Sequence, residues 1–282
     1  MQWMLLVLLY GVIKGVRDII KKKTLETHDV IEVLFMYTLL GFLLLVYDTP
    51  NAIKMDMSYL GWIFVKSFVI FIAWICSYKA ISKIPVSVFG VMDMARVLFA
   101  TLFGVVILHE SMTGHMVVGM LMVLAGLFLV NLTRGRGGEE KASTKYTVML
   151  LVSCFLNAVS ELFDKTLMSK NITSGQLQYW YMLFMVLLYL GYIIVTRMKI
   201  DWKRAVTNYW VWILSIIFII GDRALFVANK SGESTIVAMT LIKQSSVLIS
   251  VLGGRVVFKE KNITARLLCA ALVCAGVVVA VM

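Results

Sequence analysis

The chain has 282 residues, of which 61% are hydrophobic and 15% are charged, and it contains only two prolines. A soluble domain is about half apolar and about a quarter charged, so this composition excludes an ordinary soluble protein and predicts a chain embedded in lipid. The formal net charge of +11 would suggest nucleic acid as a partner of a soluble protein. In a membrane protein, loop lysines and arginines fix the topology instead, so we expect no nucleic-acid partner.

Ten apolar runs are long enough to cross a bilayer, which takes roughly 20 residues per helix. They fall at about 3–20, 30–47, 58–78, 86–108, 116–132, 147–167, 177–196, 209–228, 235–258 and 265–281. The first run lacks the basic flank and cleavage site of a signal peptide, so we expect a retained helix. The sequence therefore predicts an all-α integral membrane protein with ten transmembrane helices and no room for a soluble catalytic domain.

One polar, glycine-rich stretch, residues 134–145, lies at the midpoint of the chain and is typical of a flexible linker. We therefore expect two five-helix units, at 1–133 and 146–282. The units resemble each other when the chain is shifted by 150 residues. The matches include residue types that are uncommon in apolar helices: Trp62 with Trp212, Gly104 with Gly254, Glu110 with Glu260, and Gly126 with Gly276. We infer a duplication, and an odd number of helices per unit makes the repeat inverted in the membrane.

Ionisable side chains inside the apolar runs are costly in lipid, so each is a candidate functional residue. The first helix carries a charged stripe along one face, and a shift of 143 residues lays it on a polar stripe of the sixth helix. The two stripes are Lys14, Arg17, Asp18 and Lys21, and Asn157, Ser160, Glu161 and Asp164. Further charges in the third, fourth, eighth and ninth helices are Lys66, Asp93, Arg96, Asp222, Arg223 and Lys243. At a shift of 150 residues, Asp93 and Lys243 coincide.

These charges could simply neutralise each other, and Asp93 with Arg96 at i,i+3 is an obvious structural pair. For the whole set we favour a hydrated cavity, because buried ion pairs seldom gain stability over apolar replacements. Lys21 and Glu32 lie near helix ends, and we expect both to face water. The fifth and tenth helices hold almost no charge and carry small residues suited to close helix contact, so we place them at the periphery. They could also form a homodimer.

No metal, cofactor or catalytic group is predicted. The four cysteines lie in apolar runs, and no Cys/His cluster has the spacing of a metal site. His109-Glu110 resembles a metal pair only superficially, because Lys259-Glu260 occupies the matching position without a histidine. We interpret the aromatic run 179–181 at the start of the seventh helix as an interfacial belt rather than a substrate contact.

Two segments that follow the fourth and ninth helices have a glutamate and then a glycine-bearing helix. They read LHESMTGHMVVGMLMVLAGLFLV (108–130) and FKEKNITARLLCAALVCAGVVVAV (258–281). These segments and the ten-helix pattern resemble the EamA-like branch of the drug/metabolite transporter superfamily over essentially the whole chain. The resemblance implies two inverted five-helix repeats and a cavity lined by helices one, three, four, six, eight and nine. Its motifs are specific for the fold but poor for the substrate.

A third segment, TIVAMTLIKQSSVLISVLGGRVVFKE (235–260), is similar to the ninth helix of the sugar-phosphate and nucleotide-sugar translocator branch. In that branch a lysine in a Ser/Thr-rich helix meets a substrate phosphate, which would make Lys243 an anion contact here. The adjacent second basic residue of that branch is replaced by Gln244, which weakens the transfer.

We therefore expect a transporter of a small polar or anionic organic metabolite, bearing a phosphate or carboxylate, that works by alternating access about the charged cavity. The alternative is a flippase for a lipid-linked phosphate or sugar. An intramembrane enzyme ranks last, because no catalytic motif is present. The predicted substrate-binding residues are Lys14, Arg17, Lys66, Asp93, Arg96, Arg223 and Lys243. The predicted coupling residues are Asp18, Glu161, Asp164 and Asp222.

Most loop lysines and arginines lie after odd-numbered helices. The positive-inside rule then places those loops in the cytoplasm and both termini outside, whereas members of the resembling family usually have cytoplasmic termini. We follow the charge distribution and expect a multi-pass protein of a bacterial cytoplasmic membrane.

Overall fold

The computed structural model describes residues 2–133, 144–260 and 263–281, and every regular element within these ranges is a helix. The unbroken long helices are α1 (Gln2–Thr24), α2 (Val30–Leu43), α4 (Leu60–Lys83), α7 (Gly114–Thr133), α8 (Thr144–Met168), α9 (Ser174–Thr196), α11 (Tyr209–Asn229) and α14 (Ile263–Val281). Two spans are each a pair of shorter helices: α5 (Val86–Met92) with α6 (Ala95–Val106), and α12 (Ile236–Lys243) with α13 (Ser246–Phe258). The short elements are η1 (Val46–Asp48), α3 (Thr49–Ala52), η2 (Met57–Tyr59) and α10 (Trp202–Thr207). The predicted linker 134–145 lies outside the described residues up to position 143.

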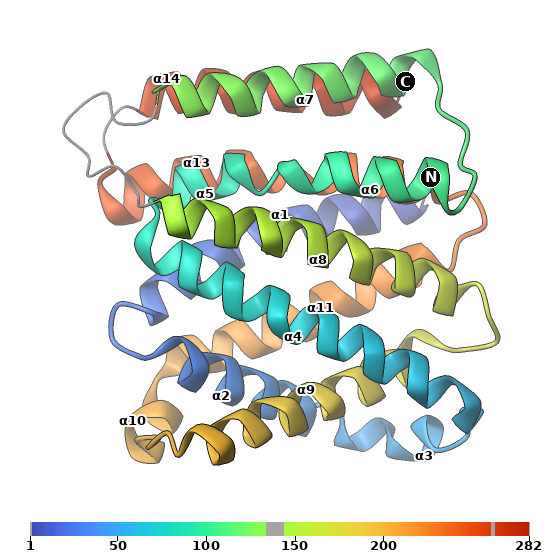
Figure 1. Ribbon diagram of the computed structural model, residues 1–282, viewed down its shortest axis with the longest axis vertical. Helices are drawn as coiled ribbons and strands as arrows, with labels where there is room; N and C mark the ends of the chain where they lie inside the picture. The colour runs from blue at the N-terminus through green and yellow to red at the C-terminus, as the bar shows by residue number, and fades with distance from the viewer. Residues whose placement is uncertain (1, 134–143, 261–262, 282) are drawn as a thin grey trace.

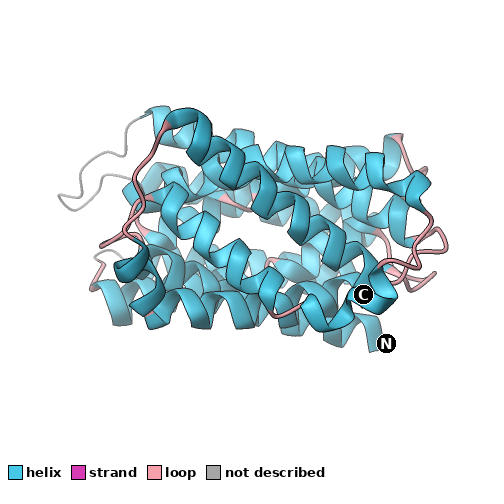
Figure 2. Cartoon of the chain, turned by 90° about the horizontal axis from the view of Figure 1, so that it is seen from below, coloured by secondary structure: helices cyan, strands magenta, loops and turns pink. Residues whose placement is uncertain are grey.

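The long helices lie side by side in a bundle (Figure 1). α7 and α14 form an outer pair at one edge, α2, α3, α9 and α10 lie at the other, and α1, α4, α8 and α11 lie between them. The start of α1 and the end of α14 lie at the same end of the bundle (Figures 1 and 2). The elements far apart in the chain are therefore interleaved, and α1 packs against α11, α12 and α13 from the second half.

The helices begin and end at local signals in the sequence. α9 starts at a capping box, in which the Thr173 side chain accepts from the Gln176 N–H and the Gln176 side chain accepts from the Thr173 N–H. α4 ends at Lys83, two residues before Pro85, which disfavours helical backbone at the residue before it. A helix pairs the backbone groups of each apolar run within the run itself, which the lipid requires because it offers no hydrogen-bond partners.

By length and composition, six of these segments can cross a membrane: 57–83, Val86–Val106, Thr144–Met168, Ser174–Thr196, Tyr209–Asn229 and Ile236–Phe258. A seventh is added if α2 and the bent segment 46–52 form one span. This count is smaller than the ten spans predicted. α1 is not among them because three ionisable residues, Lys14, Arg17 and Asp18, interrupt its apolar sequence. The apolar stretches within α7 and α14 are shorter than the others.

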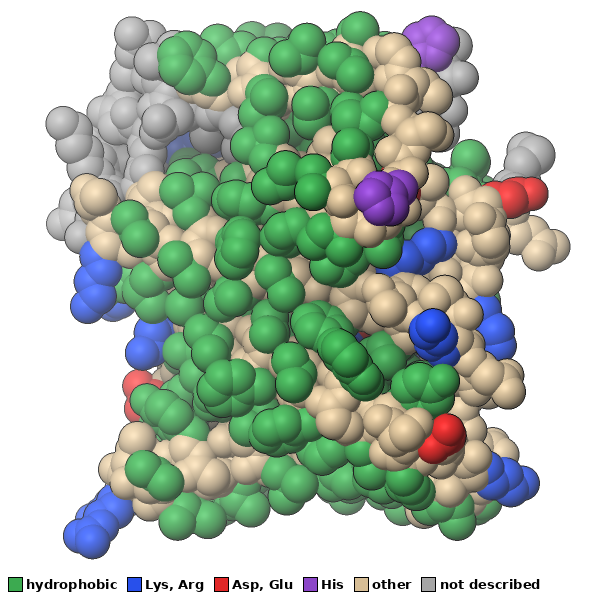
Figure 3. All heavy atoms as spheres, turned by 45° about the vertical axis from the view of Figure 1, so that its right-hand side comes forward, with side chains coloured by type: hydrophobic (Ala, Val, Ile, Leu, Met, Phe, Trp, Pro, Cys, Tyr) green, Lys and Arg blue, Asp and Glu red, His purple; other side chains and the backbone are tan. Residues whose placement is uncertain are grey.

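The outer surface has the pattern of a protein in lipid. Hydrophobic side chains cover the middle of the face shown in Figure 3, while lysine and arginine side chains gather at its two sides. Large apolar residues stand fully outward, such as Val195 with 83% of its surface exposed and Leu5 with 67%. Such exposure would be costly in water but is neutral against acyl chains.

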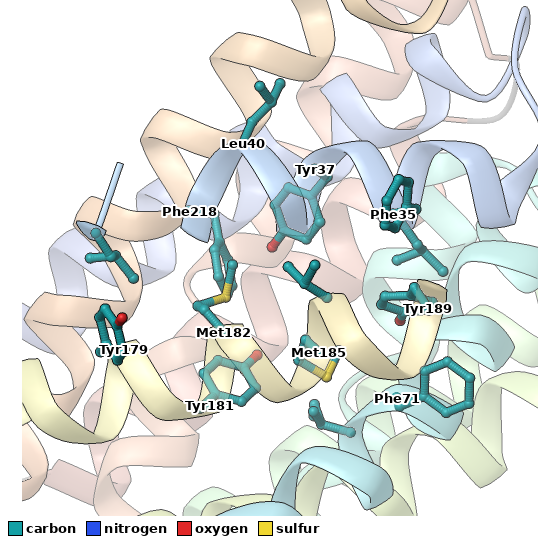
Figure 4. Packing of buried hydrophobic residues seen from close by; sticks show 14 of the residues in the cluster. Phe35, Tyr37, Leu40, Phe71, Tyr179, Tyr181, Met182, Met185, Tyr189 and Phe218 are labelled. Carbon is teal, nitrogen blue, oxygen red and sulfur yellow. The ribbon is translucent and has the colours of Figure 1, made fainter. Parts of the chain in front are cut away.

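The largest buried apolar cluster joins α2, α4, α9 and α11 (Figure 4). Tyr37 lies at its centre, with its ring centroid 4.9 Å from that of Phe218 and 5.4 Å from that of Trp74. Met182 and Met185 fill the space beside these rings without measurable exposure. This cluster fixes α11, and with it Asp222, relative to α2 and α9.

The outer helices α7 and α14 pack closely on each other. A Cβ atom at Gly276 would lie 2.8 Å from the Gly119 carbonyl oxygen and 2.9 Å from the Met122 Cβ, so the two backbones approach where both residues are small. The small residues predicted to form a helix contact therefore do so within the chain.

Two spans change their hydrogen bonding near the middle, at equivalent places in the two halves. Between α5 and α6, the N–H groups of Met94 and Val97 bond to carbonyls three residues back. Between α12 and α13, the N–H groups of Gln244, Ser245 and Val247 do the same. Such tight turns in the middle of a helix are typical of functional hinges. They bring Asp93 and Lys243, which coincide at a shift of 150 residues, to the break in each span.

Candidate functional site

A polar cavity of about 60 Å³ lies inside the bundle, with walls formed by α1, α4, α5, α6, α8, α9 and α11 and by the break after α5. Its charged lining residues are Lys14, Arg17, Asp18, Lys21, Lys66, Asp93, Arg96, Glu161, Asp164 and Asp222. The structure therefore brings together nine of the eleven predicted site residues, together with Lys21. Arg223 and Lys243 do not line the cavity.

The first group of ion pairs connects α1 to the break between α5 and α6. Lys14 Nζ lies 2.8 Å from an Asp93 oxygen and 3.6 Å from an Asp18 oxygen. Arg96 donates to Asp93 at 3.1 Å, and Lys21 to Asp18 at 2.9 Å. Each acid in this group meets two bases, so the group is well balanced for buried charges.

The second group centres on Glu161 of α8. One of its oxygens lies 2.8 Å from Lys243 Nζ and 3.5 Å from Arg96 Nη1, and the other accepts from the Thr240 hydroxyl at 2.9 Å. Lys243 thus reaches the site only through Glu161. Lys243 and Arg96 therefore balance the charge of Glu161, and Lys243 is not a free cation that faces the cavity.

A third pair joins α4 to α8. Lys66 Nζ lies 3.0 Å from Asp164 Oδ1, and it also sits 3.7 Å from the centroid of the Tyr181 ring and 5.5 Å from that of Phe226. Lys66 has only 2% of its surface exposed. An ammonium group over an aromatic face gains a cation–π contact, which is strongest where water is excluded.

Arg17 and Asp222 also line the cavity, but neither belongs to these pairs. Arg17 donates to the Tyr10 hydroxyl at 3.3 Å, and its guanidinium lies 5.1 Å from the centroid of the Phe218 ring. Asp222 is buried on α11, one residue before Arg223. The Arg223 side chain turns to the outer side of that helix, where it donates to Gln178 at 2.6 Å and to Asp48 at 3.3 Å.

Two sequence-based interpretations are corrected here. Lys21 and Glu32 do not face water, because each has only 8% of its surface exposed. α1 continues to Thr24, so Lys21 still has a helical turn beyond it and lies on the same face as Asp18. Glu32 lies in the first turn of α2, a helix against which α9, α10 and α11 pack.

The aromatic residues of the cavity wall were missed as site residues. Tyr181 has 2% of its surface exposed and lies over Lys66, so it is not part of an interfacial belt. Of the run 179–181, Tyr181 lies on the inner face of α9 and lines the cavity. The apolar periodicity of the sequence did not distinguish it from its two neighbours. Tyr10 could have been found, because it lies seven residues before Arg17 and therefore on the same face of α1.

The paired glutamates of the two halves form equivalent contacts, which we call the glutamate clasps. Glu110 accepts from the N–H groups of Ile236 and Val237, at 2.7 and 3.2 Å, at the start of α12. Glu260 accepts from those of Val86 and Ser87, also at 2.7 and 3.2 Å, at the start of α5. Each clasp therefore joins the end of one broken span to the start of the other.

The same backbone geometry shapes both clasps. The residues before the two glutamates, His109 and Lys259, have left-handed φ angles of 53° and 52°. A Cβ at Gly104 would lie 2.7 Å from a Glu110 carboxylate oxygen, and a Cβ at Gly254 would lie 2.7 Å from one of Glu260. The paired glycines noted in the sequence are thus the residues over which the glutamates fold.

A lysine accompanies each clasp. Lys22 of α1 donates to the carbonyl of Ile84, just before α5, and Lys165 of α8 donates to the carbonyl of Ser234, just before α12. The two lysines are related by the 143-residue shift and the two acceptors by the 150-residue shift. The C-terminal ends of α1 and α8 lie at opposite ends of the bundle (Figure 1).

A helical bundle with an apolar outer surface and paired charges in its interior is typical of an integral membrane protein. The sequence model of the EamA-like transporter family matches residues 1–132. The family consists of membrane transporters of the drug/metabolite transporter superfamily.

A solved crystal structure of another protein is similar to the whole chain. Its TM-score is 0.69 at 14% sequence identity, and the match covers 97% of this chain and 98% of that one. At this identity the likeness shows a shared fold. No curated protein sequence matches the chain at a significant level.

Proposed function

We propose that the chain transports a small polar or anionic organic metabolite through the central cavity by alternating access. The observation that carries this proposal is the cavity itself: ten charged residues, eight of them buried, line a space inside a lipid-embedded bundle. A charged side chain in the middle of a membrane costs about 2.5–3.5 kcal/mol on insertion scales. Such side chains are therefore retained where a polar solute uses them. Transport is the activity of the family whose sequence model matches residues 1–132.

The two glutamate clasps support an inverted repeat of units 1–133 and 146–282. Two halves of opposite orientation present the same contact once at each face of the membrane. The equal distances at Glu110 and Glu260, and the matched lysines Lys22 and Lys165, are what such a repeat requires. Both clasps are closed in this structure, and the cavity is small. Release of one clasp while the other persists would open the cavity to one face at a time.

Cavity accessibility tests this mechanism without knowledge of the substrate. Ser160 lines the cavity with 3% exposure, so Ser160→Cys in a background that lacks the four native cysteines reports its opening. We expect Glu110→Ala to increase labelling by a membrane-impermeant thiol reagent severalfold from the face that carries the chain termini. Glu260→Ala should increase it from the opposite face. Glu26→Ala is the matched control, because that carboxylate is exposed and, among the described residues, pairs with nearby Lys23.

The same experiment can reject the proposal. If both clasp variants lower stability equally and labelling stays the same from both faces, the clasps hold the fold together and do not gate the cavity. Reconstituted protein that flips a fluorescent phospholipid, but takes up no soluble metabolite, would favour the flippase instead.

A further inference from the structure

A second pocket, of about 440 Å³, opens at the end of the bundle opposite the chain termini and shares no lining residue with the central cavity. Its walls come from the α1–α2 connection, the last two turns of α4 and the first turns of α8, which lie at that end in Figure 1. We call it the basic pocket, because three lysines line it: Lys79, Lys83 and Lys145. Both halves of the chain therefore contribute to it.

The three lysines of the basic pocket have no acidic partner in the described part of the chain, where no carboxylate oxygen lies within 4.0 Å of their Nζ atoms. Neighbouring Lys23, by contrast, pairs with Glu26 at 2.7 Å. One acid, Asp29, also lines the pocket, so three lysines against one aspartate, with His28 neutral, leave a net charge of +2. The pocket thus offers ammonium donors to an anionic group from outside the chain.

Helix dipoles explain only part of this arrangement. Lys83 is in the last turn of α4, where the carbonyl end of the helix stabilises a base. Lys145 is instead the second residue of α8, at the amide end, where a base is disfavoured and no acid in the first turn offsets it. The amide end of α8 and three ammonium groups therefore meet at one place, which favours a bound anion.

The surface next to the basic pocket is apolar and faces lipid. A row on one face of α8 continues from Lys145 at helical spacing, with Val148, Val152 and Phe155. These three residues have 51%, 42% and 42% of their surface exposed. Tyr146 lines the pocket and also packs against the buried apolar cluster of α4, α5 and α8. A base followed by an exposed apolar row matches a molecule with an anionic head and a hydrocarbon chain better than it matches a soluble ion.

We propose that the basic pocket binds the phosphate headgroup of an anionic phospholipid, whose acyl chains lie along the apolar row of α8. The pocket lies at the face that the loop charges predict to be cytoplasmic, where anionic lipids give the membrane a negative surface potential. A bound lipid joins α4 of the first half to α8 of the second, so its binding stabilises the folded bundle. This site is independent of the central cavity and of the solute that the cavity holds.

Three matched compounds separate the contributions of the charge and of the chains. Dioleoyl phosphatidylglycerol is anionic, dioleoyl phosphatidylcholine has the same chains and no net charge, and glycerophosphoglycerol is the anionic headgroup alone. We expect phosphatidylglycerol to bind the purified protein in native mass spectrometry and to raise its melting temperature in detergent. The other two should bind at least about tenfold more weakly, because one lacks the charge and the other lacks the chains.

Neutralisation of the basic pocket tests the lysines. Lys79→Gln/Lys83→Gln/Lys145→Gln should weaken phosphatidylglycerol binding by about 10- to 100-fold, because each lysine near the headgroup contributes about fivefold. Binding of phosphatidylcholine should stay the same. The matched control replaces three exposed lysines at the other end of the bundle by glutamine: Lys54, Lys170 and Lys230. It makes the same change in total charge and should keep phosphatidylglycerol binding.

Two further variants separate binding from folding and test the chains. An acid suits the amide end of α8, so Lys145→Glu should melt no lower than the wild type, yet it should bind phosphatidylglycerol at least about tenfold more weakly. Val148→Ser/Val152→Ser should also weaken phosphatidylglycerol binding, because it shortens the apolar row. Its control is Ile194→Ser/Val195→Ser, an exposed apolar pair on α9, which should bind as the wild type does.

Several results would overturn the proposal. Equal binding of the two lipids would show that the headgroup charge is not recognised, and a wild-type affinity in Lys145→Glu would exclude the basic pocket. Equal losses in the two triple-lysine variants would show an effect of total charge and not of a site. Glycerophosphoglycerol that binds as tightly as phosphatidylglycerol would assign the pocket to a soluble phosphate compound in place of a lipid.

Discussion

Replacement of Lys66 by methionine measures how much the buried pairs of the cavity wall contribute to stability. Methionine keeps most of the volume of lysine but removes the charge, which leaves Asp164 without the Nζ group now 3.0 Å away. Loss of one partner from a buried ion pair costs about 3–5 kcal/mol, because the other charge is left uncompensated. The lost cation–π contact with Tyr181, at 3.7 Å, adds about 1–2 kcal/mol and places Lys66→Met toward the upper end.

Each kcal/mol shifts the melting temperature of a chain of this size by about 2–4 °C, so Lys66→Met should lower it by about 6–20 °C. Intrinsic-fluorescence melting in detergent measures the shift. The double variant Lys66→Met/Asp164→Asn should recover most of the loss, because it removes both charges. Lys170→Met, at an exposed lysine, should change the value by no more than about 1–2 °C. A single variant as stable as Lys170→Met, or a double variant no better than the single, would refute this account of the pair.

Three further predictions follow from other contacts. Gly276→Ala should destabilise the protein, because its Cβ would meet the Gly119 carbonyl at 2.8 Å, whereas Gly191→Ala in α9 has open space and should be neutral or stabilising in the same melting assay. Lys243→Met should lower the melting temperature, and adding Glu161→Gln should restore part of it, since the two side chains are 2.8 Å apart; independent losses would contradict the pairing. A reporter enzyme that works only outside the cytoplasm should be active when fused after Met282, and a reporter that works only in the cytoplasm should be inactive there. A clear cytoplasmic signal would reject the orientation inferred from loop charges.

The sequence predicted the helices well because apolar length is a strong signal in lipid. It did not predict the breaks at 93–94 and 244–245, since neither place holds the proline or glycine that usually marks one. The glutamate and glycine matches indicated a repeat. They did not predict the contacts of these residues, because those contacts depend on how α5–α6 and α12–α13 pack antiparallel.

The site was predicted as a set of residues but not as a set of partners. The charged stripes correctly placed Lys14, Arg17 and Glu161 in one interior, because helical spacing alone determines a shared face. Which base meets which acid depends on the register between helices, so the resemblance favoured Lys243 as the free cation although Glu161 occupies it. Asp222 and Arg223 are adjacent on a helix and point about 100° apart, so only one of them could line the cavity.

The breaks in the two spans also suit opposite charges at their equivalent positions. A helix that is interrupted presents two poles at the same place: the carbonyl end of the preceding segment, which is negative, and the amide end of the following one, which is positive. Asp93 lies beside the amide end of α6, and Lys243 is the last residue of α12, at its carbonyl end. Either sign is therefore stabilised at the break by the backbone itself. Under the proposed duplication, the two halves become electrostatic opposites through side-chain changes alone, while their backbones stay alike.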